Sequence, residues 1–278
     1  MDHIPCREQV YPLKLAAEFV HFYRRYTHWL KELLERLGNH AALAIWQAAF
    51  QDGEDTLLGE ILSTGWLPTN DDIVDISIEK DHVLAEFFSS PVEGLTIEQA
   101  RQLVDEARPF QLISHRLPSL NVERETTAYE TIHLFWNGIA RLVEALISRH
   151  GKEGELIAYN VMLRWFALNQ RPGMEAAEFL RIFTTQPDQP SMHTASLRYD
   201  LVYASDSEVV IHIRECEWAR YFRQRNPGVG YQLICSMDEI SYRAVHPSIR
   251  MQRTSTLMEG GELCDFRIYS VDEKGNQG

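Results

Sequence analysis

Apolar positions in the first third of the chain follow a helical period. Between Ala17 and Leu37 they recur every three or four residues, and Gly38-Asn39 then supplies a stop signal. A second helix is predicted over residues 41–50, and a shorter one at 57–62. This part of the chain is therefore predicted to be helical.

Two further segments precede residue 120. Thr96 followed by Gln99 three residues later matches a capping box, so a helix is predicted to begin there. Residues 71–90 are acidic and alternate in the manner of a strand, which leaves their class open. A loop that contains Pro118 marks a predicted boundary, with a helical region over 1–120 and a second domain over 121–278.

The broadest apolar stripe of the sequence runs from Ile132 to Ile147 and predicts a long amphipathic helix. Gly151 ends it, and further helices are predicted over 153–168 and 174–183. These helices come directly before a change in the hydrophobic period.

After Pro190 the period becomes two, which is typical of strands. Residues 196–215 predict a first hairpin with an Asp-Ser turn, and Arg253–Ile268 predict a second hairpin that turns at residues 259–262. A helix pair lies between them in the sequence. The predicted fold class is α+β: an N-terminal helical region, then helices packed on a four-stranded antiparallel sheet made of two hairpins.

Composition narrows the class of partner. The formal charge of −13 argues against nucleic acid or an anionic membrane as the main partner. No secretory signal and no membrane-spanning stretch is visible. Four cysteines in a chain of this length do not make a disulfide framework, so reduced thiols and a cytoplasmic location are expected.

Common catalytic signatures are missing from the sequence. It contains no phosphate-binding G-x-x-x-x-G-K-[ST] loop, no H-E-x-x-H zinc motif and no G-x-S-x-G elbow. His212 and Cys216 are four residues apart but fall across a strand-to-helix junction, where side chains need not converge. No metal and no cofactor is expected.

Cys264 is the first candidate for chemistry. Alternation places Cys264, Phe266 and Ile268 on one face of the last strand, and Asp265 and Arg267 on the other. One interpretation is that Cys264 is a small buried hydrophobic residue. The other is that the apolar face lines a pocket and that the thiol points into it, where a nearby cation or helix N-terminus would lower its pKa.

Cys216 and Asp238 are the other candidate catalytic residues. Cys216 follows a strand and opens the next helix, where unpaired N–H groups favour a thiolate, although the residue could simply cap that helix. Asp238 lies on the following helix, as either a general base or a solvent-facing acid. Cys235, three residues earlier, is expected on the same face of that helix.

Four residues are candidates for substrate binding: Arg253, His246, Phe266 and His212. Arg253 is predicted in the middle of a strand among apolar residues, so it needs a carboxylate partner from the protein or from a substrate. His246 precedes Pro247 in a predicted loop, which also allows a plain surface position.

These features together resemble a known family. The cysteine that opens a helix (Cys216), the Cys-x-x-Asp helix (Cys235, Asp238), the "RTSTL" strand and the "CDFR" run after a glycine corner are similar to the bacterial L-2-amino-thiazoline-4-carboxylate hydrolases. The resemblance extends over roughly Thr127 to Tyr269. The terminal "G-x-x-C-x-F" pattern also resembles the four-vinyl-reductase-type ligand-binding domain, which joins helices to an antiparallel sheet.

The resemblance implies hydrolysis of a cyclic amidine-like C–N bond. The named substrate is a five-membered thiazoline that bears a carboxylate and is opened to an N-carbamoyl amino acid. Cys216, Asp238 and Cys264 fall on family motif positions. A thiolate or an activated water would attack the ring carbon, a carboxylate would manage the proton, and Arg253 would pair with the substrate carboxylate.

Two other functions stay open, because a fold hosts many activities. One is a non-catalytic module that binds or senses a small molecule. The other is a non-hydrolytic biosynthetic enzyme on the same scaffold, and a hydrolase here could itself serve a secondary-metabolite pathway. In each case a small molecule is the expected partner, and the long helices could also join two chains as a homodimer.

Overall fold

The fold is that of a computed structural model, which describes residues 6–51, 73–74, 77–89, 95–107, 110, 117–118, 123–169, 174–184 and 195–271. The chain divides into two compact units. Unit 1 comprises residues 1–11, 127–129 and 158–278, and unit 2 comprises residues 12–126 and 130–157. The domain boundary predicted near residue 120 from the sequence stays a prediction.

Unit 2 is built around the helix α1 (Leu15–Gln51). Gly38 interrupts this helix with φ 73° and ψ 164°, so that two helical segments meet at a kink. That conformation is left-handed in φ, where glycine has no Cβ penalty. The predicted pair of helices separated by Gly38 is therefore confirmed as one kinked element.

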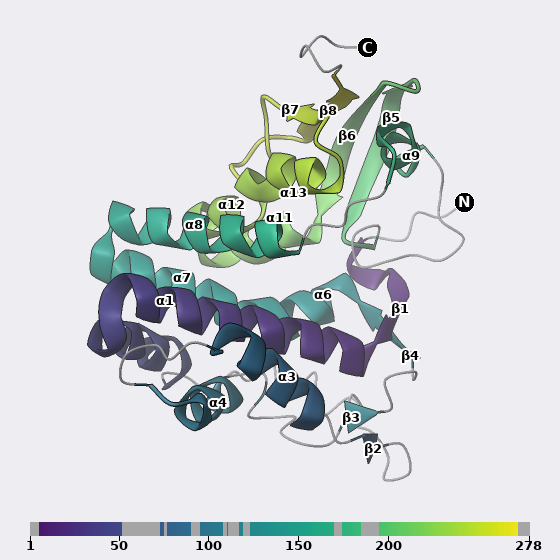
Figure 1. Cartoon of the computed structure of the whole chain (residues 1–278). Coiled ribbons are helices and arrows are strands. Elements are labelled where there is room, and N and C mark those ends of the chain that lie inside the picture. Colours follow the sequence, from purple (N-terminus) through teal and green to yellow (C-terminus); the bar gives the residue numbers. More distant parts are fainter. Residues whose placement is uncertain are drawn as a thin grey trace. The chain divides into compact units, whose positions relative to one another are not determined.

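The remaining elements of unit 2 lie around α1 (Figure 1). The helices are α3 (Ser77–Phe87), α4 (Ile97–Glu106) and α7 (Asn137–His150), which follows a π-helical turn, Ile132–Trp136. Before that turn comes α6 (Ala128–Thr131), whose first two residues belong to unit 1. The strand β1 (Val10–Lys14) pairs with β4 (Glu123–Thr127), and β2 (Ile73–Val74) pairs with β3 (Leu117–Pro118). The core of the unit is aromatic, as in the stacked rings of Phe22 and Phe135 with centroids 4.6 Å apart.

Sequence predictions for unit 2 meet three outcomes. The capping box is confirmed: Thr96 Oγ1 accepts from the Gln99 amide at 3.2 Å, and the Gln99 side chain accepts from the Thr96 amide at 2.9 Å. Much of the ambiguous acidic segment is helical, as α3. The helix predicted at residues 57–62 lies outside the described residues.

Unit 1 contains the predicted four-stranded antiparallel sheet (Figure 1). Its strands are β5 (Leu197–Ala204), β6 (Glu208–Cys216), β7 (Ile249–Gln252) and β8 (Cys264–Ser270), in the order β5-β6-β8-β7. Two hairpins, β5–β6 and β7–β8, therefore make the sheet, and the α+β class is confirmed. Each hairpin contributes one central strand and one edge strand.

Helices cover one face of this sheet. The two that pack on its core are α9 (Ala176–Arg181) and α13 (Asp238–Val245). The other helices of unit 1 are η1 (Cys6–Glu8), α8 (Lys152–Leu168, from Ala158 onward), α11 (Glu217–Arg225), α12 (Pro227–Leu233) and the short 3₁₀ helix η4 (Cys235–Met237). Phe179 of α9 and Tyr242 of α13 pack with ring centroids 5.3 Å apart over the buried residues of the sheet. Cys264, Phe266 and Ile268 belong to this core, as their alternation predicts.

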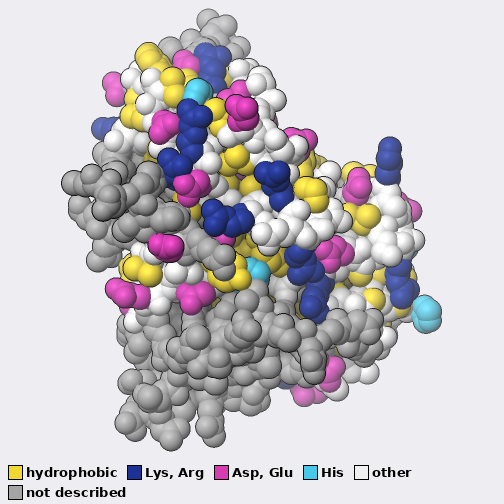
Figure 2. Space-filling model, turned by 180° about the vertical axis from the view of Figure 1, so that it is seen from behind, with side chains coloured by type: hydrophobic (Ala, Val, Ile, Leu, Met, Phe, Trp, Pro, Cys, Tyr) yellow, Lys and Arg dark blue, Asp and Glu magenta, His cyan; other side chains and the backbone are white. Residues whose placement is uncertain are grey.

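The opposite face of the sheet carries charged pairs. Arg214 donates to Asp200 at 2.9 Å, and Arg267 donates to Glu208 at 2.6 Å. Figure 2, which views the molecule from behind, shows basic and acidic side chains interspersed over its upper part. Within the described part of the chain, no helix combines the length and apolar character needed to cross a membrane.

The second hairpin differs from its prediction along its first strand, because residues 253–258, which were expected to form that strand, lie in the connection between β7 and β8. Arg253 was expected in mid-strand, but β7 ends at Gln252 and Arg253 opens the long connection to β8. The cause is that a side chain takes the place of a partner strand as hydrogen-bond acceptor. Asp265 Oδ1 accepts from the amides of Thr254 and Ser255 at 2.9 and 2.7 Å. Those amides are therefore turned away from strand pairing.

Candidate functional site

A β-bulge in β6 determines where Cys216 points. Arg198 pairs with Glu215 and Tyr199 pairs with Ile213, so Arg214 is an extra residue in the ladder. Ile213 faces the helix-covered core, and strict alternation would turn Cys216 to the charged face. Because the bulge shifts the phase by one residue, Cys216 packs against the same core as Cys264.

Cys216 caps α11. Its backbone is extended (φ −143°, ψ 115°) and its Sγ accepts from the Ala219 amide at 3.4 Å. The sequence suggested that this helix terminus would favour a thiolate. Burial instead raises the pKa of Cys216 to about 12, and the amides of Ala219 and Trp218, which act in the lowering direction, do not offset it. The thiol is therefore protonated near neutral pH.

Cys264 lies at the start of β8 and is buried. Its Sγ accepts from the Leu257 amide at 3.1 Å, so the side chain holds the connection that returns from Arg253. Burial raises the pKa of Cys264, although the Leu257 amide and the Arg253 guanidinium act in the opposite direction. Cys264 thus packs in the core, and although the Arg253 guanidinium acts on it, its pKa is raised and not lowered.

Asp238 is the first residue of α13, directly after η4. Burial raises the pKa of its carboxyl to about 6, and the Arg253 guanidinium counteracts that rise only in part. A carboxyl that titrates close to neutral pH can both accept and donate a proton under ordinary conditions. Asp238 is therefore suited to general acid–base chemistry.

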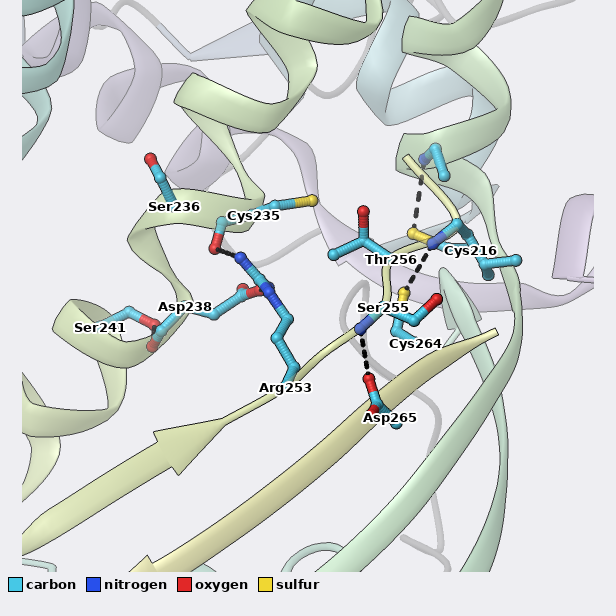
Figure 3. A network of polar contacts seen from close by, with 12 residues as sticks. Cys216, Cys235, Ser236, Asp238, Ser241, Arg253, Ser255, Thr256, Cys264 and Asp265 are labelled. Atoms are coloured by element: carbon cyan, nitrogen blue, oxygen red, sulfur yellow. Dashed lines mark hydrogen bonds and ion pairs between the residues drawn. The ribbon is translucent and has the colours of Figure 1, made fainter. Parts of the chain in front are cut away.

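Arg253 joins this carboxyl to the sheet. Its Nη1 donates to Asp238 Oδ2 at 2.6 Å, and its Nη2 donates to the Cys235 carbonyl (Figure 3). The guanidinium also lies 5.5 Å from the ring centroids of both Tyr231 and Phe266. Burial alone would lower the pKa of Arg253, but Asp238 and the other partners raise it, so the cation is retained.

These residues form a single cluster in unit 1, which we call the thiol–carboxylate cluster: Cys216, Cys235, Asp238, Arg253 and Cys264. Figure 3 shows that they come from β6, η4, α13, the segment after β7 and β8, and that the sulfurs of Cys216 and Cys264 lie on the same side of the sheet. Their charges act on one another, since Asp238 raises the pKa of all three thiols. The structure thus brings together the three predicted catalytic residues and two of the predicted binding residues, Arg253 and Phe266.

Two predicted binding residues lie elsewhere. His212 pairs with Asp265 in the ladder, on the face of the sheet opposite to Phe266 and Cys264, because it precedes the bulge. His246 caps the far end of α13, about 12 Å along the helix axis from Asp238. Its Nδ1 accepts from the Ser248 amide at 3.2 Å, so the ring shapes the turn into β7.

Tyr231 and Cys235 were not among the predicted site residues. Cys235 holds the arginine through its backbone carbonyl, and a sequence pattern reveals no such backbone role. The Cys-x-x-Asp spacing was nevertheless a signal that Cys235 accompanies Asp238. Tyr231 lies on α12 and contacts Arg253 across two separate segments of the chain, which no local pattern could indicate.

The donor set does not make a metal centre. No three or more His, Cys, Asp or Glu side chains are arranged to hold a metal ion in the regions that the structure describes. Unit 1 also contains a groove of about 370 Å³, which is lined by Leu163, Phe166, Ala167, Ile240, Arg243, Ala244 and Pro247. It contains none of the cluster residues, so it is a separate feature of α8 and α13.

Comparison with known proteins bears on the same region. The sequence model of the L-2-amino-thiazoline-4-carboxylic acid hydrolase family matches residues 132–268, which include every residue of the thiol–carboxylate cluster. No curated protein and no solved structure matches the chain. The cluster therefore lies within residues 132–268, the region that is similar to the L-2-amino-thiazoline-4-carboxylic acid hydrolase family.

Proposed function

We propose that the thiol–carboxylate cluster hydrolyses a small cyclic amidine that bears a carboxylate, of the 2-aminothiazoline-4-carboxylate type. The observation that carries the proposal is the Arg253–Asp238 pair at 2.6 Å, in which a carboxyl with a pKa of about 6 faces a retained cation. The family name of the matched region supports the same reaction class.

Arg253 is the proposed anchor for the substrate carboxylate. A guanidinium binds a carboxylate through parallel N–H bonds, and in the free protein Asp238 occupies one of these positions. An incoming substrate carboxylate would take over part of this contact. Asp238 would then lose part of the charge that lowers its pKa and become a stronger base beside the bound ring. Phe266 offers an apolar surface below the guanidinium.

Water is the proposed nucleophile. The thiols are protonated because burial raises the pKa of each, so a ready thiolate is missing from the cluster. Asp238 takes a proton from a water molecule as its oxygen bonds to the amidine carbon, and the π electrons of the C=N bond move to the nitrogen, to which Asp238 passes that proton. The bond from that carbon to a ring atom then breaks as the C=O bond forms, its electron pair leaves with the ring atom, and Asp238 transfers the remaining hydroxyl proton to it. The S–H groups of Cys216 and Cys264 serve as weak donors.

The bond that breaks determines the product. If the ring nitrogen departs, the product carries a free amine and an S-carbamoyl group. If the ring sulfur departs, the product carries a free thiol and an N-carbamoyl group. Each product contains the substrate plus one water, so mass spectrometry detects hydrolysis and a thiol assay assigns the bond.

The test is incubation with a panel of thiazoline and cyclic amidine carboxylates, followed by mass spectrometry. Asp238→Asn, Cys216→Ser and Cys264→Ser are compared with Glu239→Gln, which changes the adjacent acid of the same helix. We expect turnover to fall in the first three variants and to persist in the fourth. Full turnover in all of the first three would remove the cluster from the reaction.

One observation favours a second candidate, a non-catalytic module that binds a small carboxylate. Three protonated thiols and a closed ion pair also suit a binding pocket without chemistry. The same panel separates the two functions, because a binding module would retain ligands unchanged. A product without the added water would indicate a non-hydrolytic enzyme instead.

A further inference from the structure

Arg253 stands at a position where the backbone is not held by strand pairing. It directly follows the last residue of β7, yet its guanidinium must reach Asp238 on α13 and the Cys235 carbonyl on η4. A long side chain at the start of a connection loses rotamer entropy when it is ordered. Some other group must therefore fix the segment that follows Arg253.

Asp265 supplies three hydrogen bonds to that segment. Its carboxylate accepts from the amides of Thr254 and Ser255 at 2.9 and 2.7 Å, and from the Thr254 hydroxyl at 2.5 Å. Burial would raise its pKa, but these bonds outweigh burial and lower it, so the carboxylate stays ionised. Charge-assisted bonds of this type are stronger and shorter than neutral ones.

The same strand holds the segment from its other face. Cys264 Sγ accepts from the Leu257 amide at 3.1 Å, whereas Asp265 points to the opposite side of β8 (Figure 3). The Gly261 amide donates to the Thr256 carbonyl at 2.9 Å and closes the connection upon itself. Residues 254–257 are thus bound on two sides by consecutive residues of β8.

We propose that Asp265 is a positioning residue, which holds Arg253 against Asp238 by binding the two amides that follow Arg253. It acts from the outer face of the sheet and does not touch the substrate site. The proposal rests on the proposed function for its catalytic consequence, but its structural consequence can be measured without any substrate.

The direct measurement is the titration of the Asp238 carboxyl by carbon-13 NMR, assigned with Asp238→Asn. The groups that act on this carboxyl are Arg253 and the three thiols of the cluster, with Tyr242 beside them. In Asp265→Asn the charge is lost and Arg253 becomes less ordered. The pKa of Asp238 should then rise above its value of about 6, because burial persists while the lowering by Arg253 weakens.

Two further variants sharpen the result. Asp200→Asn removes an acid that pairs with Arg214 on the same outer face, and it should leave the Asp238 titration unchanged. Thr254→Ala removes one of the three bonds to Asp265 and should give a smaller rise than Asp265→Asn. An unchanged Asp238 pKa in folded Asp265→Asn would overturn the proposal. If that variant does not fold, the presence or absence of a shift in Thr254→Ala decides it.

Turnover provides the second readout. For a carboxylated substrate, kcat/KM of Asp265→Asn should fall by on the order of 10- to 100-fold, as expected for a displaced anchoring group. For the matching substrate without a carboxylate the fall should be much smaller, because Arg253 has nothing to bind. Equal losses for both substrates would contradict a positioning role. If wild-type protein turns over no substrate of the panel, the proposed function fails while the NMR result still decides the role of Asp265.

Discussion

Arg253 and Asp238 form an ion pair of 2.6 Å that links the segment after β7 to the first residue of α13. The two residues come from separate elements, and both side chains are largely buried, with exposed fractions of 10% and 23%. Removing one partner of such a pair leaves a charge with little access to water. Substitutions at either residue are therefore expected to change both the proposed reaction and the free energy of unfolding.

Asp238→Asn should reduce turnover by about 100-fold or more, which is the usual contribution of a positioned general base. Asparagine keeps the shape of the side chain but cannot take up the proton. The measurement is the initial rate with a substrate identified from the panel. Glu239→Gln is the control, and an equal loss in both variants would point to damage of α13 rather than to lost chemistry.

The rate should depend on pH through Asp238. Because burial raises the pKa of this carboxyl to about 6, kcat/KM should decrease as the pH falls through about 6. A pH–rate profile between pH 4.5 and 8 measures this acid limb. An acid limb near pH 4, the range of an ordinary exposed aspartate, would show that another group controls the reaction.

Stability should show the same titration with a defined sign. The native pKa of Asp238 is raised above its ordinary value of 3.8, so between about pH 4 and pH 6 the native state binds more protons than the unfolded state. As the pH rises from about 4 to about 6, the free energy of unfolding of wild type should therefore decrease relative to that of Asp238→Asn, and above pH 6 the difference should level off. Urea titrations at several pH values test this, and a relative increase with pH would contradict the raised pKa.

Cys216 allows capping to be separated from chemistry. Its sulfur accepts from the Ala219 amide, and serine is a favourable residue at the same capping position. Cys216→Ser should thus change the free energy of unfolding by less than about 1 kcal/mol, whereas Cys216→Ala should lose about 1 kcal/mol of capping. Chemical denaturation measures both. If the two variants are equally stable, the cap contributes nothing and only a chemical role is left for the thiol.

Gly261→Ala should destabilise the connection between β7 and β8. A Cβ at this position would lie 2.2 Å from Ser255 Oγ and 2.9 Å from the Thr256 carbonyl oxygen. Such overpacking costs about 1–3 kcal/mol. Gly228→Ala is the matched control, since its Cβ would meet only Asn226 Oδ1 at 3.3 Å. Similar unfolding free energies for both variants would show that the connection yields without cost.

Local patterns sufficed for much of the fold. Thr96 and Gln99 predicted the start of α4, because a capping box is contained within one helical turn. Gly38 predicted the break in α1, because the backbone conformation of a glycine is a local property. The alternation of Cys264, Phe266 and Ile268 likewise predicted the buried face of β8. Each of these signals lies in residues that are near neighbours in the chain.

The candidate site depended on contacts that local patterns do not contain. Strict alternation misplaces Cys216, because the extra residue Arg214 exists only relative to the partner strand β5. Arg253 leaves the strand because Asp265 accepts from the amides of Thr254 and Ser255, which lie eleven and ten positions before it, and a strand ladder would otherwise use those amides. The helix-terminus rule favoured a Cys216 thiolate, but burial by distant segments raises its pKa to about 12.

The sequence by itself therefore determined the fold class, the order of its elements and the residue types available for chemistry. Those properties follow from hydrophobic period, glycine positions and capping, which act over a few residues. Tertiary structure alone decided which side chains meet and which protons they hold. Pairing register and desolvation set those properties, and both arise only when segments far apart in the chain pack together.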